Sequence, residues 1–408
     1  MKFIADLHVH SRYSRGCSRE LTPENLWQWG QLKGLNVLGT GDFTHPVWLA
    51  ELESKLEPAA NGLLALREEY RCAEVPPSCR SELYFLPSAE ISCIYRKHER
   101  TRKVHLIIFA PDLACAARIN RELARIGNLS ADGRPILGLD AKRALEIVLA
   151  ASPDAMLVPA HAWTPHFSIF GAASGFDSLA ECFEELAPHI YAIETGLSSD
   201  PRMNRRISNL DRLTLISNSD AHSLAKLGRE ANLFDTELSY QGIITAIRTG
   251  KGFSGTIEFF PEEGKYYADG HRNCGIRFTP SEYGKHTGLC PVCGRKLTMG
   301  VQHRVNDLAD RAEEGLPGMP PFYSTIPLQE LIAQVIGVGV ASKKVKTMYF
   351  DLLERLGPEL EILLTIPATQ IGQVAPPRLA EAIALMRSGK VIIEPGYDGA
   401  FGIVRIYN

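Results

Sequence analysis

The chain has 408 residues, of which 45% are hydrophobic and 22% are charged, and its formal net charge is −3. This composition is typical of soluble globular proteins, and the length allows two or three domains. The net charge gives no support to nucleic-acid binding by the chain as a whole, and no apolar run reaches the ~18 residues of a membrane helix. The charged N-terminus is unlike a signal peptide. The nine cysteines, three of them at metal-ligand spacing, favour a reducing cytoplasm over a disulfide framework.

Residues 1–255 alternate between short apolar runs and stretches of helical periodicity. Strands are predicted near 2–6, 35–40, 83–88, 103–109, 155–160, 190–193 and 213–217. Helices are predicted at Glu24–Leu32, Pro46–Leu66 and Ala141–Leu149, the first of them started by Thr22-Pro23. Strands that alternate with helices predict an α/β domain with a mostly parallel sheet, either open or closed into a barrel.

Each predicted strand carries an imidazole or a carboxylate in it or just after it. In chain order these are His8 and His10, Asp42 and His45, Glu90, His105, His161, Glu194, and finally Asp220 and His222. A single His at a strand end is more often a hydrogen-bonded structural residue, but seven successive coincidences point to one shared site. In an α/β barrel these strand ends form one mouth. There the side chains would bind two or three divalent ions.

The ligand types indicate the chemistry. Mixed histidine and carboxylate sites suit Zn²⁺, Mn²⁺ or Fe²⁺ better than an all-oxygen Mg²⁺ site does. Two close metal ions activate a water molecule and hold the oxygens of an in-line displacement at phosphorus, so phosphoester hydrolysis is the expected reaction. Glu194 and His45 lie near the predicted mouth, where each would support a ligand or donate a proton to the leaving oxygen.

These residues resemble the PHP (polymerase and histidinol phosphatase) domain, which implies a distorted (β/α)7 barrel with a di- or trinuclear metal site. The His-x-His motif of the family matches His8 and His10, and Thr40-Gly41-Asp42 stands where Thr-Asp-His is usual. The resemblance also implies metal-ligand roles for Glu90, His105, His161, Asp220 and His222. Many members have a further ligand about six residues after the first motif. Ser14-Arg15-Gly16-Cys17 offers none here, so a third metal ion is not assured.

Residues 256–305 read as a small zinc-binding module. Cys290-Pro291-Val292-Cys293-Gly294 is typical of a zinc knuckle, Cys274 is a third thiolate, and His271 or His286 would be the fourth ligand of one structural zinc. Residues 264–305 contain seven Lys or Arg and two acidic residues, a local net charge of +5, interleaved with aromatic rings. This pattern suits contact with nucleic acid, although a zinc-stapled fold with a solvated basic face would look the same.

Residues 306–408 are expected to form a mainly helical C-terminal domain that binds DNA. The linker Pro317–Pro321 precedes predicted helices at Leu328–Ile336, Val345–Leu356 and Pro377–Arg387. The turn at residues 337–344 would either hold a DNA phosphate or simply join two helices. Lys390–Glu394 and Phe401–Tyr407 predict a closing β-hairpin.

The order of these three parts resembles the endonuclease Q family. The likeness lies in Ala5–Ser14, Gly39–Pro46, Glu194–Pro201, Ser217–His222, Cys290–Val305 and Ile392–Phe401. It implies a metal-dependent DNA repair endonuclease that cuts on the 5′ side of uracil, hypoxanthine, xanthine or an abasic site in double-stranded DNA. The alternatives are a PHP-type small-molecule phosphoesterase and a non-catalytic DNA-binding scaffold. The sequence does not indicate whether a replication clamp binds the chain.

Overall fold

The computed structural model describes residues 1–72 and 74–407, and its largest sheet has eight strands. Their order is β16 (Phe322–Ser324), β13 (Phe253–Glu258), β12 (Ala231–Asp235), β1 (Lys2–Asp6), β2 (Val37–Gly39), β5 (Tyr84–Leu86), β4 (Leu64–Leu66) and β3 (Leu56–Pro58). Strands β1, β2 and β5 are parallel neighbours, whereas β12 pairs antiparallel with both β1 and β13. The ends of the three parallel strands therefore open at the same edge of the sheet.

Two further ladders complete the strand framework of the N-terminal region. One sheet has the order β8 (Ile136–Leu137), β6 (Ser88–Lys97), β7 (Arg100–Phe109) and β9 (Met156–Pro159), and β10 (Ala192–Glu194) pairs in parallel with β11 (Thr214–Ile216). All seven predicted strands overlap strands of the structure. Main-chain pairing of the described residues is divided among separate ladders, so the closed seven-stranded barrel stays a prediction.

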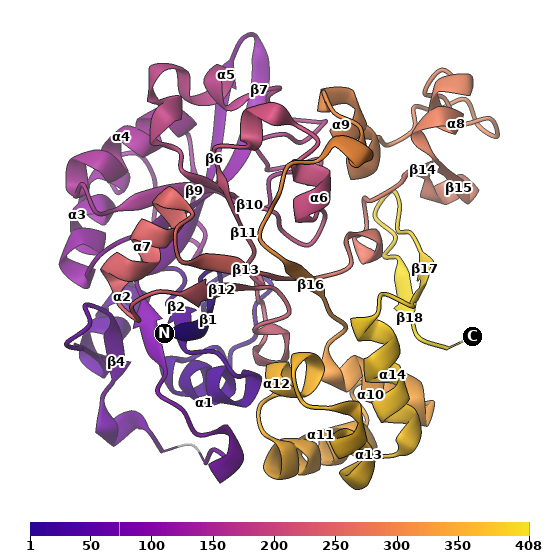
Figure 1. The fold of residues 1–408 in the computed structure, drawn as a ribbon. Helices are drawn as coiled ribbons and strands as arrows, with labels where there is room; N and C mark the ends of the chain where they lie inside the picture. The colour runs from indigo at the N-terminus through magenta and orange to yellow at the C-terminus, as the bar shows by residue number, and fades with distance from the viewer. Residues whose placement is uncertain (73, 408) are drawn as a thin grey trace.

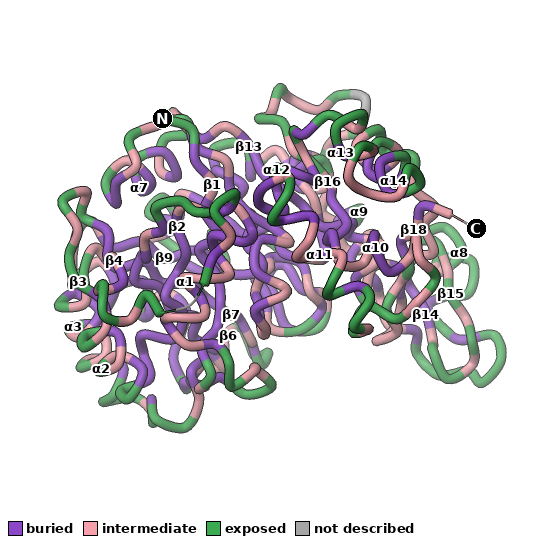
Figure 2. Tube along the Cα trace, turned by 90° about the horizontal axis from the view of Figure 1, so that it is seen from below, coloured by how far each residue is buried: buried purple, intermediate pink, exposed green. Residues whose placement is uncertain are grey.

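Helices lie around the outside of these strands (Figure 1), and the strands themselves are largely buried (Figure 2). The helices of this region are α1 (Pro23–Lys33), α2 (Pro46–Lys55), α3 (Leu113–Leu123), α4 (Ala141–Ala151), α5 (Leu179–Phe183), α6 (Pro201–Asn204) and α7 (Tyr240–Thr249). The predicted start of α1 is confirmed, because Oγ1 of Thr22 accepts from the amide of Asn25 and Pro23 opens the helix.

One predicted helix is too long. Pro46–Leu66 was expected to be helical throughout, but α2 ends at Lys55 and a hairpin of β3 and β4 follows. Pro58 and the Asn61-Gly62 pair stop the helix, since Gly62 has a φ of +74° that suits a turn. Strands β12 and β13 were not predicted at all.

The remaining elements form the predicted zinc-binding module and the C-terminal region. The module contains β14 (Asp269–His271), β15 (Ile276–Phe278) and α8 (Pro280–Lys285), and α9 (Val301–Leu308) follows it. The C-terminal helices are α10 (Leu328–Ile336), α11 (Lys343–Leu356), α12 (Glu359–Leu364), α13 (Ala368–Val374) and α14 (Pro377–Arg387), and the predicted hairpin is present as β17 (Ile392–Glu394) with β18 (Ile403–Arg405). The predicted helical C-terminal region is therefore confirmed.

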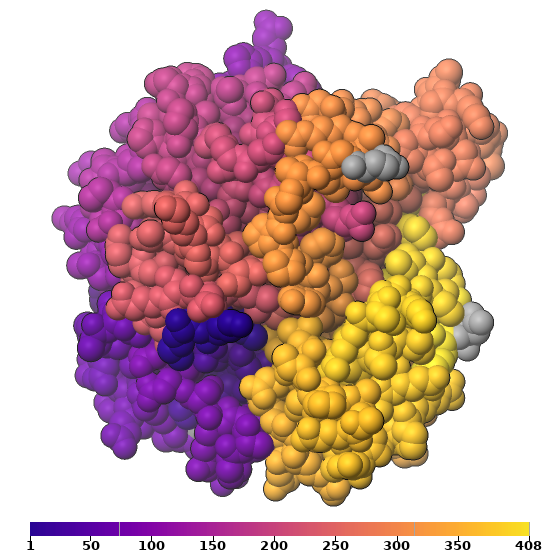
Figure 3. Space-filling view, viewed as in Figure 1, coloured from indigo at the N-terminus to yellow at the C-terminus, as the bar shows by residue number. Residues whose placement is uncertain are grey.

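The C-terminal helices pack against α1, which lies beside α12 in Figure 1. Figure 3 shows the golden C-terminal region directly against the purple part of the N-terminal region. Trp29 of α1 stacks on Tyr349 of α11, with ring centroids 6.4 Å apart. Strand β16, which follows the predicted linker, pairs in parallel with β13 and so returns to the N-terminal sheet. The predicted boundary at residue 306 would therefore assign β16 and its partner β13 to different domains, although both belong to one sheet. The domain limits stay a prediction. Among the described helices, none has the length and apolarity needed to span a membrane.

Candidate metal centre

The centre begins at the exit of β1, where His8 and His10 are both buried. Nδ1 of His8 lies 3.0 Å from Oε1 of Glu194. Nε2 of His8 is also buried and has no hydrogen-bond partner among the residues that the structure describes. Because a buried polar atom is normally paired, this nitrogen suggests a ligand that is not a protein atom.

Glu90, on β6, joins two groups of donor atoms. Its Oε1 lies 2.7 Å from Nδ1 of His105 and 3.1 Å from Nε2 of His161. Its Oε2 lies 3.4 Å from Nε2 of His10 and 3.5 Å from Nε2 of His8. Within each group the donor atoms lie within 4.8 Å of one another: one group is His8, His10, Glu90 and Asp220, and the other is Glu90, His105 and His161. A shared carboxylate between two donor sets fits a pair of divalent ions.

The electrostatics of the centre favour positive charge. Burial alone would lower the pKa of His8, but the carboxylates of Glu194 and Glu90 outweigh it and raise that pKa well above its ordinary value. Burial would raise the pKa of Glu90, yet the charges of His105 and Arg134 hold it well below its usual range. Burial lowers the pKa of His105 to about 4, so this ring is neutral at pH 7 and free to bind a metal ion.

Asp42 lies behind His10 and outside both donor groups, which departs from its predicted place as a metal ligand. Its Oδ1 is 3.0 Å from Nδ1 of His10, and its Oδ2 accepts from the amide of Ser11 and from Oγ of Ser14. Gly41 explains this placement, since its φ is +62° and an added Cβ would lie 2.4 Å from the carbonyl oxygen of Val9. The close approach turns Asp42 toward the Nδ1 side of the ring, where it orients His10.

Glu194 and His45 were predicted to support a ligand or to donate a proton. Glu194 is fully buried, contacts His8, and accepts from the amide of His161 at 2.8 Å, so its geometry fits support of the ligands. His45 lies outside both groups. Its Nδ1 accepts from the amide of Trp48 at the start of α2, and its ring stacks on Tyr13 with centroids 4.4 Å apart. In this structure His45 caps α2 and packs on Tyr13, and its part in proton transfer stays a prediction.

His222 also differs from its predicted place. Its ring stacks edge-on against His10, with centroids 4.7 Å apart, and its Nδ1 lies 2.8 Å from the carbonyl oxygen of Asp220. It belongs to neither donor group but borders the cavity beside them. Three residues of the centre, Asp42, Asp220 and His161, have positive φ values of 46°, 46° and 28°. Backbone strain of this kind gathers at functional sites.

Sequence reasoning missed Arg134, which lies between α3 and β8. Its Nη1 donates to Oε2 of Glu90 at 3.1 Å. It also missed Asn218, whose side chain donates to Glu194 and accepts from the amide of Leu7. Asn218 follows β11 two residues before Asp220, and that position was a usable signal. Arg134 has no motif around it and is brought to Glu90 only by the fold.

A cavity of about 500 Å³ opens beside the donor groups. His105, His161, Asp220 and His222 line one side of it, and Arg229 with Gly196 and Leu197 extend the wall. The lining also includes Lys265, Tyr266 and Phe401, which come from distant parts of the chain. The cavity is thus lined by residues of the candidate metal centre, of the predicted zinc-binding module and of the C-terminal hairpin.

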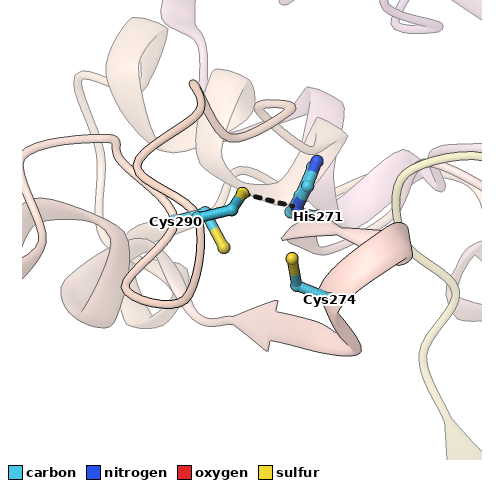
Figure 4. A group of neighbouring side chains, drawn as sticks. His271, Cys274 and Cys290 are labelled. Carbon is cyan, nitrogen blue, oxygen red and sulfur yellow. Dashed lines mark hydrogen bonds between the residues drawn. The ribbon is translucent and has the colours of Figure 1, made fainter.

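The module holds the third group of donors, shown in Figure 4. The donor atoms of His271, Cys274, Cys290 and Cys293 lie within 4.8 Å of one another. Burial would raise the pKa of Cys290, but hydrogen bonds from the amides of Cys293 and Val292 lower it to about 7. The alternative ligand His286 stacks instead on Phe278, with centroids 4.8 Å apart, so the structure brings His271 to the thiols. Three thiols and one imidazole suit a closed tetrahedral zinc site.

Comparison with known proteins finds relatives for parts of the chain and for its full length. The family model of the MJ0043 C-terminal domain matches residues 327–390. The uncharacterized protein MJ0043 of Methanocaldococcus jannaschii is 33% identical over 248 residues, which is 59% of this chain and 31% of that protein. The chain thus spans about a third of the length of that relative.

Two solved structures match over the full length. One is the lesion-specific endonuclease PfuEndoQ from Pyrococcus furiosus, with a TM-score of 0.86, 31% identity, and coverage of 100% of this chain and 96% of that one. The other is an endonuclease Q bound to a 27-mer duplex substrate with an abasic lesion at the active site. It has a TM-score of 0.85, 31% identity, and coverage of 100% and 97%. The chain belongs to the endonuclease Q family.

Proposed function

We propose that this protein is a metal-dependent DNA repair endonuclease. The observation that carries the proposal is the likeness of the whole chain to a lesion-specific endonuclease, at a TM-score of 0.86 and 31% identity. The related structure with an abasic duplex supports damaged double-stranded DNA as the partner. The proposed reaction is hydrolysis of the phosphodiester bond on the 5′ side of a deaminated base (uracil, hypoxanthine or xanthine) or of an abasic site.

The proposed ligands of two divalent ions are the two donor groups that share Glu90. His8, His10 and Asp220 complete one set, and His105 and His161 complete the other. The unpaired, buried Nε2 of His8 and the mixed donors both fit Zn²⁺ or Mn²⁺. Bound there, such ions polarise a phosphodiester and activate water. Ser14, in the region where many PHP domains have a further ligand, instead donates a hydrogen bond to Asp42, so two ions are proposed.

The supporting residues fix the orientation of these ligands. Glu194 accepts from the amide of His161 and lies against His8, so one buried carboxylate positions residues that follow two different strands. Asp42 does the same for His10. Arg134 holds Glu90 and keeps about a quarter of its side chain exposed, so its guanidinium is also available to attract a phosphate group.

The zinc-binding module and the C-terminal region are proposed to bind the duplex. Residues 264–305 carry a local net charge of +5, and Lys265 and Tyr266 of this segment reach the rim of the cavity. A cavity of about 500 Å³ beside the metal ligands has room for a nucleotide turned out of the helix. His271, Cys274, Cys290 and Cys293 would hold one zinc ion that stabilises the module.

The test compares two substrate classes on the same preparation. The protein, supplied with Mn²⁺ or Mg²⁺, is incubated with duplexes that contain one uracil, one hypoxanthine or one abasic site, with an undamaged duplex, and separately with a phosphomonoester such as p-nitrophenyl phosphate. Cleavage of the damaged duplexes alone is expected. Phosphate release from the small ester without any cut in damaged DNA would overturn the proposal and favour a small-molecule phosphoesterase.

A further inference from the structure

Phe401 is the most exposed large apolar side chain in the part of the chain that the structure describes, at 73%, and it borders the cavity of the metal centre. An aromatic ring this exposed contributes little to the core. At the rim of a catalytic cavity, such a ring is placed to meet a ligand. Phe401 belongs to the turn between β17 and β18, more than 170 residues after the last donor of the centre, and only the fold brings them together.

The turn that carries Phe401 is hydrogen-bonded to residues 262–265, which precede β14. The amides of Gly396 and Gly402 donate to the carbonyl oxygens of Glu262 and Glu263, at 2.8 and 2.9 Å. The amide of Gly399 donates to the carbonyl oxygen of Lys265 at 2.8 Å. Three main-chain hydrogen bonds therefore fix both flanks of Phe401 before any ligand arrives, which lowers the entropy that binding would cost.

Residues further along the zinc-binding module contact the same turn. Asp398 accepts from the amide of Arg272 at 2.7 Å and from Oγ1 of Thr298 at 2.6 Å. Nη1 of Arg277 donates to the carbonyl oxygen of Pro395 at 3.0 Å. The module therefore helps to fix the position of Phe401, in addition to providing a basic surface.

A cation and a second ring accompany Phe401 at the rim. Nζ of Lys265 lies 5.9 Å from the ring centroid of Phe401 and 5.6 Å from that of Tyr266. Rings that stack on bases, next to a cation for the phosphate backbone, are what a surface needs to hold a distorted nucleic-acid strand. A wedge of this kind fills the gap that a nucleotide leaves when it is turned out of the helix.

We propose that Phe401 is this wedge: it enters the base stack of the duplex as the damaged nucleotide moves into the cavity, and Lys265 and Tyr266 hold the flanking strand. The inference rests on the proposed nuclease function and adds a positioning residue to it. Stacking of one base on an aromatic ring is worth about 10- to 100-fold in binding, so the loss of the ring should cost that much where a paired base must be displaced.

The test separates extrusion of the nucleotide from hydrolysis. Single-turnover cleavage is measured for the wild type, Phe401→Ala, Phe401→Trp and the control Ile403→Ala, which lies on the same hairpin, is half exposed, and does not line the cavity. One substrate has uracil paired within a duplex, and the other has the same uracil in a bubble of unpaired nucleotides. We expect Phe401→Ala to lower the ratio of the paired rate to the bubble rate about 10- to 100-fold, Phe401→Trp to restore it, and Ile403→Ala to leave it unchanged.

Other outcomes overturn the proposal in distinct ways. Equal losses on both substrates, or no loss on either, would show that Phe401 is not a wedge although the protein is a nuclease. No cleavage of either substrate by the wild type would remove the proposed function itself. As a readout independent of hydrolysis, 2-aminopurine beside the lesion should brighten when the metal-loaded, cleavage-deficient Asp220→Asn protein binds, and less so when Phe401→Ala is added to it. Equal brightening by both would contradict the inference.

Discussion

The carboxylate of Asp42 lies 3.0 Å from Nδ1 of His10, on the side of the ring opposite to Asp220, which lies 2.9 Å from Nε2. The two carboxylates therefore have different tasks. Asp220 belongs to a donor group, whereas Asp42 fixes the imidazole that belongs to the same group. Outer partners of this kind typically change metal affinity by 10- to 100-fold when they are mutated.

Asp42→Asn should accordingly weaken divalent-ion binding about 10- to 100-fold without abolishing it, because the amide keeps the shape of the side chain but loses the charge that orients His10. Titration of Mn²⁺ or Zn²⁺ into chelator-treated protein measures this effect. Asp235→Asn, at an exposed position at the end of β12, is the matched control and should bind like the wild type. Unchanged affinity in Asp42→Asn would contradict the orienting role.

The cysteine knuckle gives a second prediction. The purified protein should lose one zinc ion per chain in Cys290→Ser, and the variant should unfold at a lower temperature, because structural zinc contributes directly to folding free energy. Cys72→Ser changes an exposed cysteine outside the cluster and should keep both the zinc and the melting temperature. Mass spectrometry measures the zinc content, and calorimetry measures the melting temperature. A Cys290→Ser protein with full zinc content would exclude the proposed ligand set.

A buried ion pair between α1 and α12 gives the third prediction. Nζ of Lys33 lies 2.5 Å from Oε2 of Glu359, and both side chains are almost fully buried. Glu359 also accepts from the amide of Leu328 and the hydroxyl of Tyr349. Glu359→Ala should destabilise the protein by about 3–5 kcal/mol, because it leaves the Lys33 ammonium buried without its partner.

Urea unfolding followed by tryptophan fluorescence measures this loss, since Trp29 lies at the interface between α1 and the C-terminal helices. Glu361→Ala is the control, because Glu361 has no ion-pair partner among the described residues. If the double variant Lys33→Met/Glu359→Ala were as unstable as Glu359→Ala alone, the unpaired charge would not be the cause.

The buried carboxyl of Glu258 predicts a dependence of stability on pH. Burial, together with the charge of Asp200, raises its pKa to about 8. Between about pH 4.5 and pH 8 the folded chain therefore keeps a proton on Glu258 that the unfolded chain releases. Because the folded state binds more protons in this window, the free energy of unfolding should fall as the pH rises through it.

Glu258→Gln removes that ionisation and should flatten the fall, so that the variant loses less stability than the wild type between pH 5.5 and pH 8.5. Glu185→Gln, at an exposed position, should retain the slope of the wild type. Thermal unfolding at three pH values in this range measures the slope of stability against pH for each protein. A slope that is the same in Glu258→Gln and the wild type would contradict the assignment.

The positions of the candidate ligands on the fold were predictable because they follow local patterns. His8 and His10 alternate at a strand end, and His161 and Asp220 follow buried runs that are strands in the structure. The Cys-x-x-Cys knuckle was equally local. In each case the spacing and the strand together fix where a side chain emerges.

The remaining features depend on how distant segments meet. The turn at Gly41 decides that Asp42 reaches the Nδ1 side of His10, and no spacing rule gives that orientation. Arg134 approaches Glu90 from a loop, and Phe401 reaches the cavity from the last hairpin. The Pro46–Leu66 helix was overextended because apolar residues of the β3–β4 hairpin continued its periodicity. Tertiary packing decided each of these features.

The most direct measurement is the map of the cut on an end-labelled duplex with one abasic site, in the presence of Mn²⁺. The wild type and the exposed control Glu185→Gln should produce a single cut on the 5′ side of the lesion, leaving a 3′-hydroxyl. Asp220→Asn, which changes a donor of the proposed metal centre, should reduce cleavage at least 10²-fold. A cut on the 3′ side, a cut in the undamaged duplex, or full activity of Asp220→Asn would contradict lesion-specific cleavage at this centre.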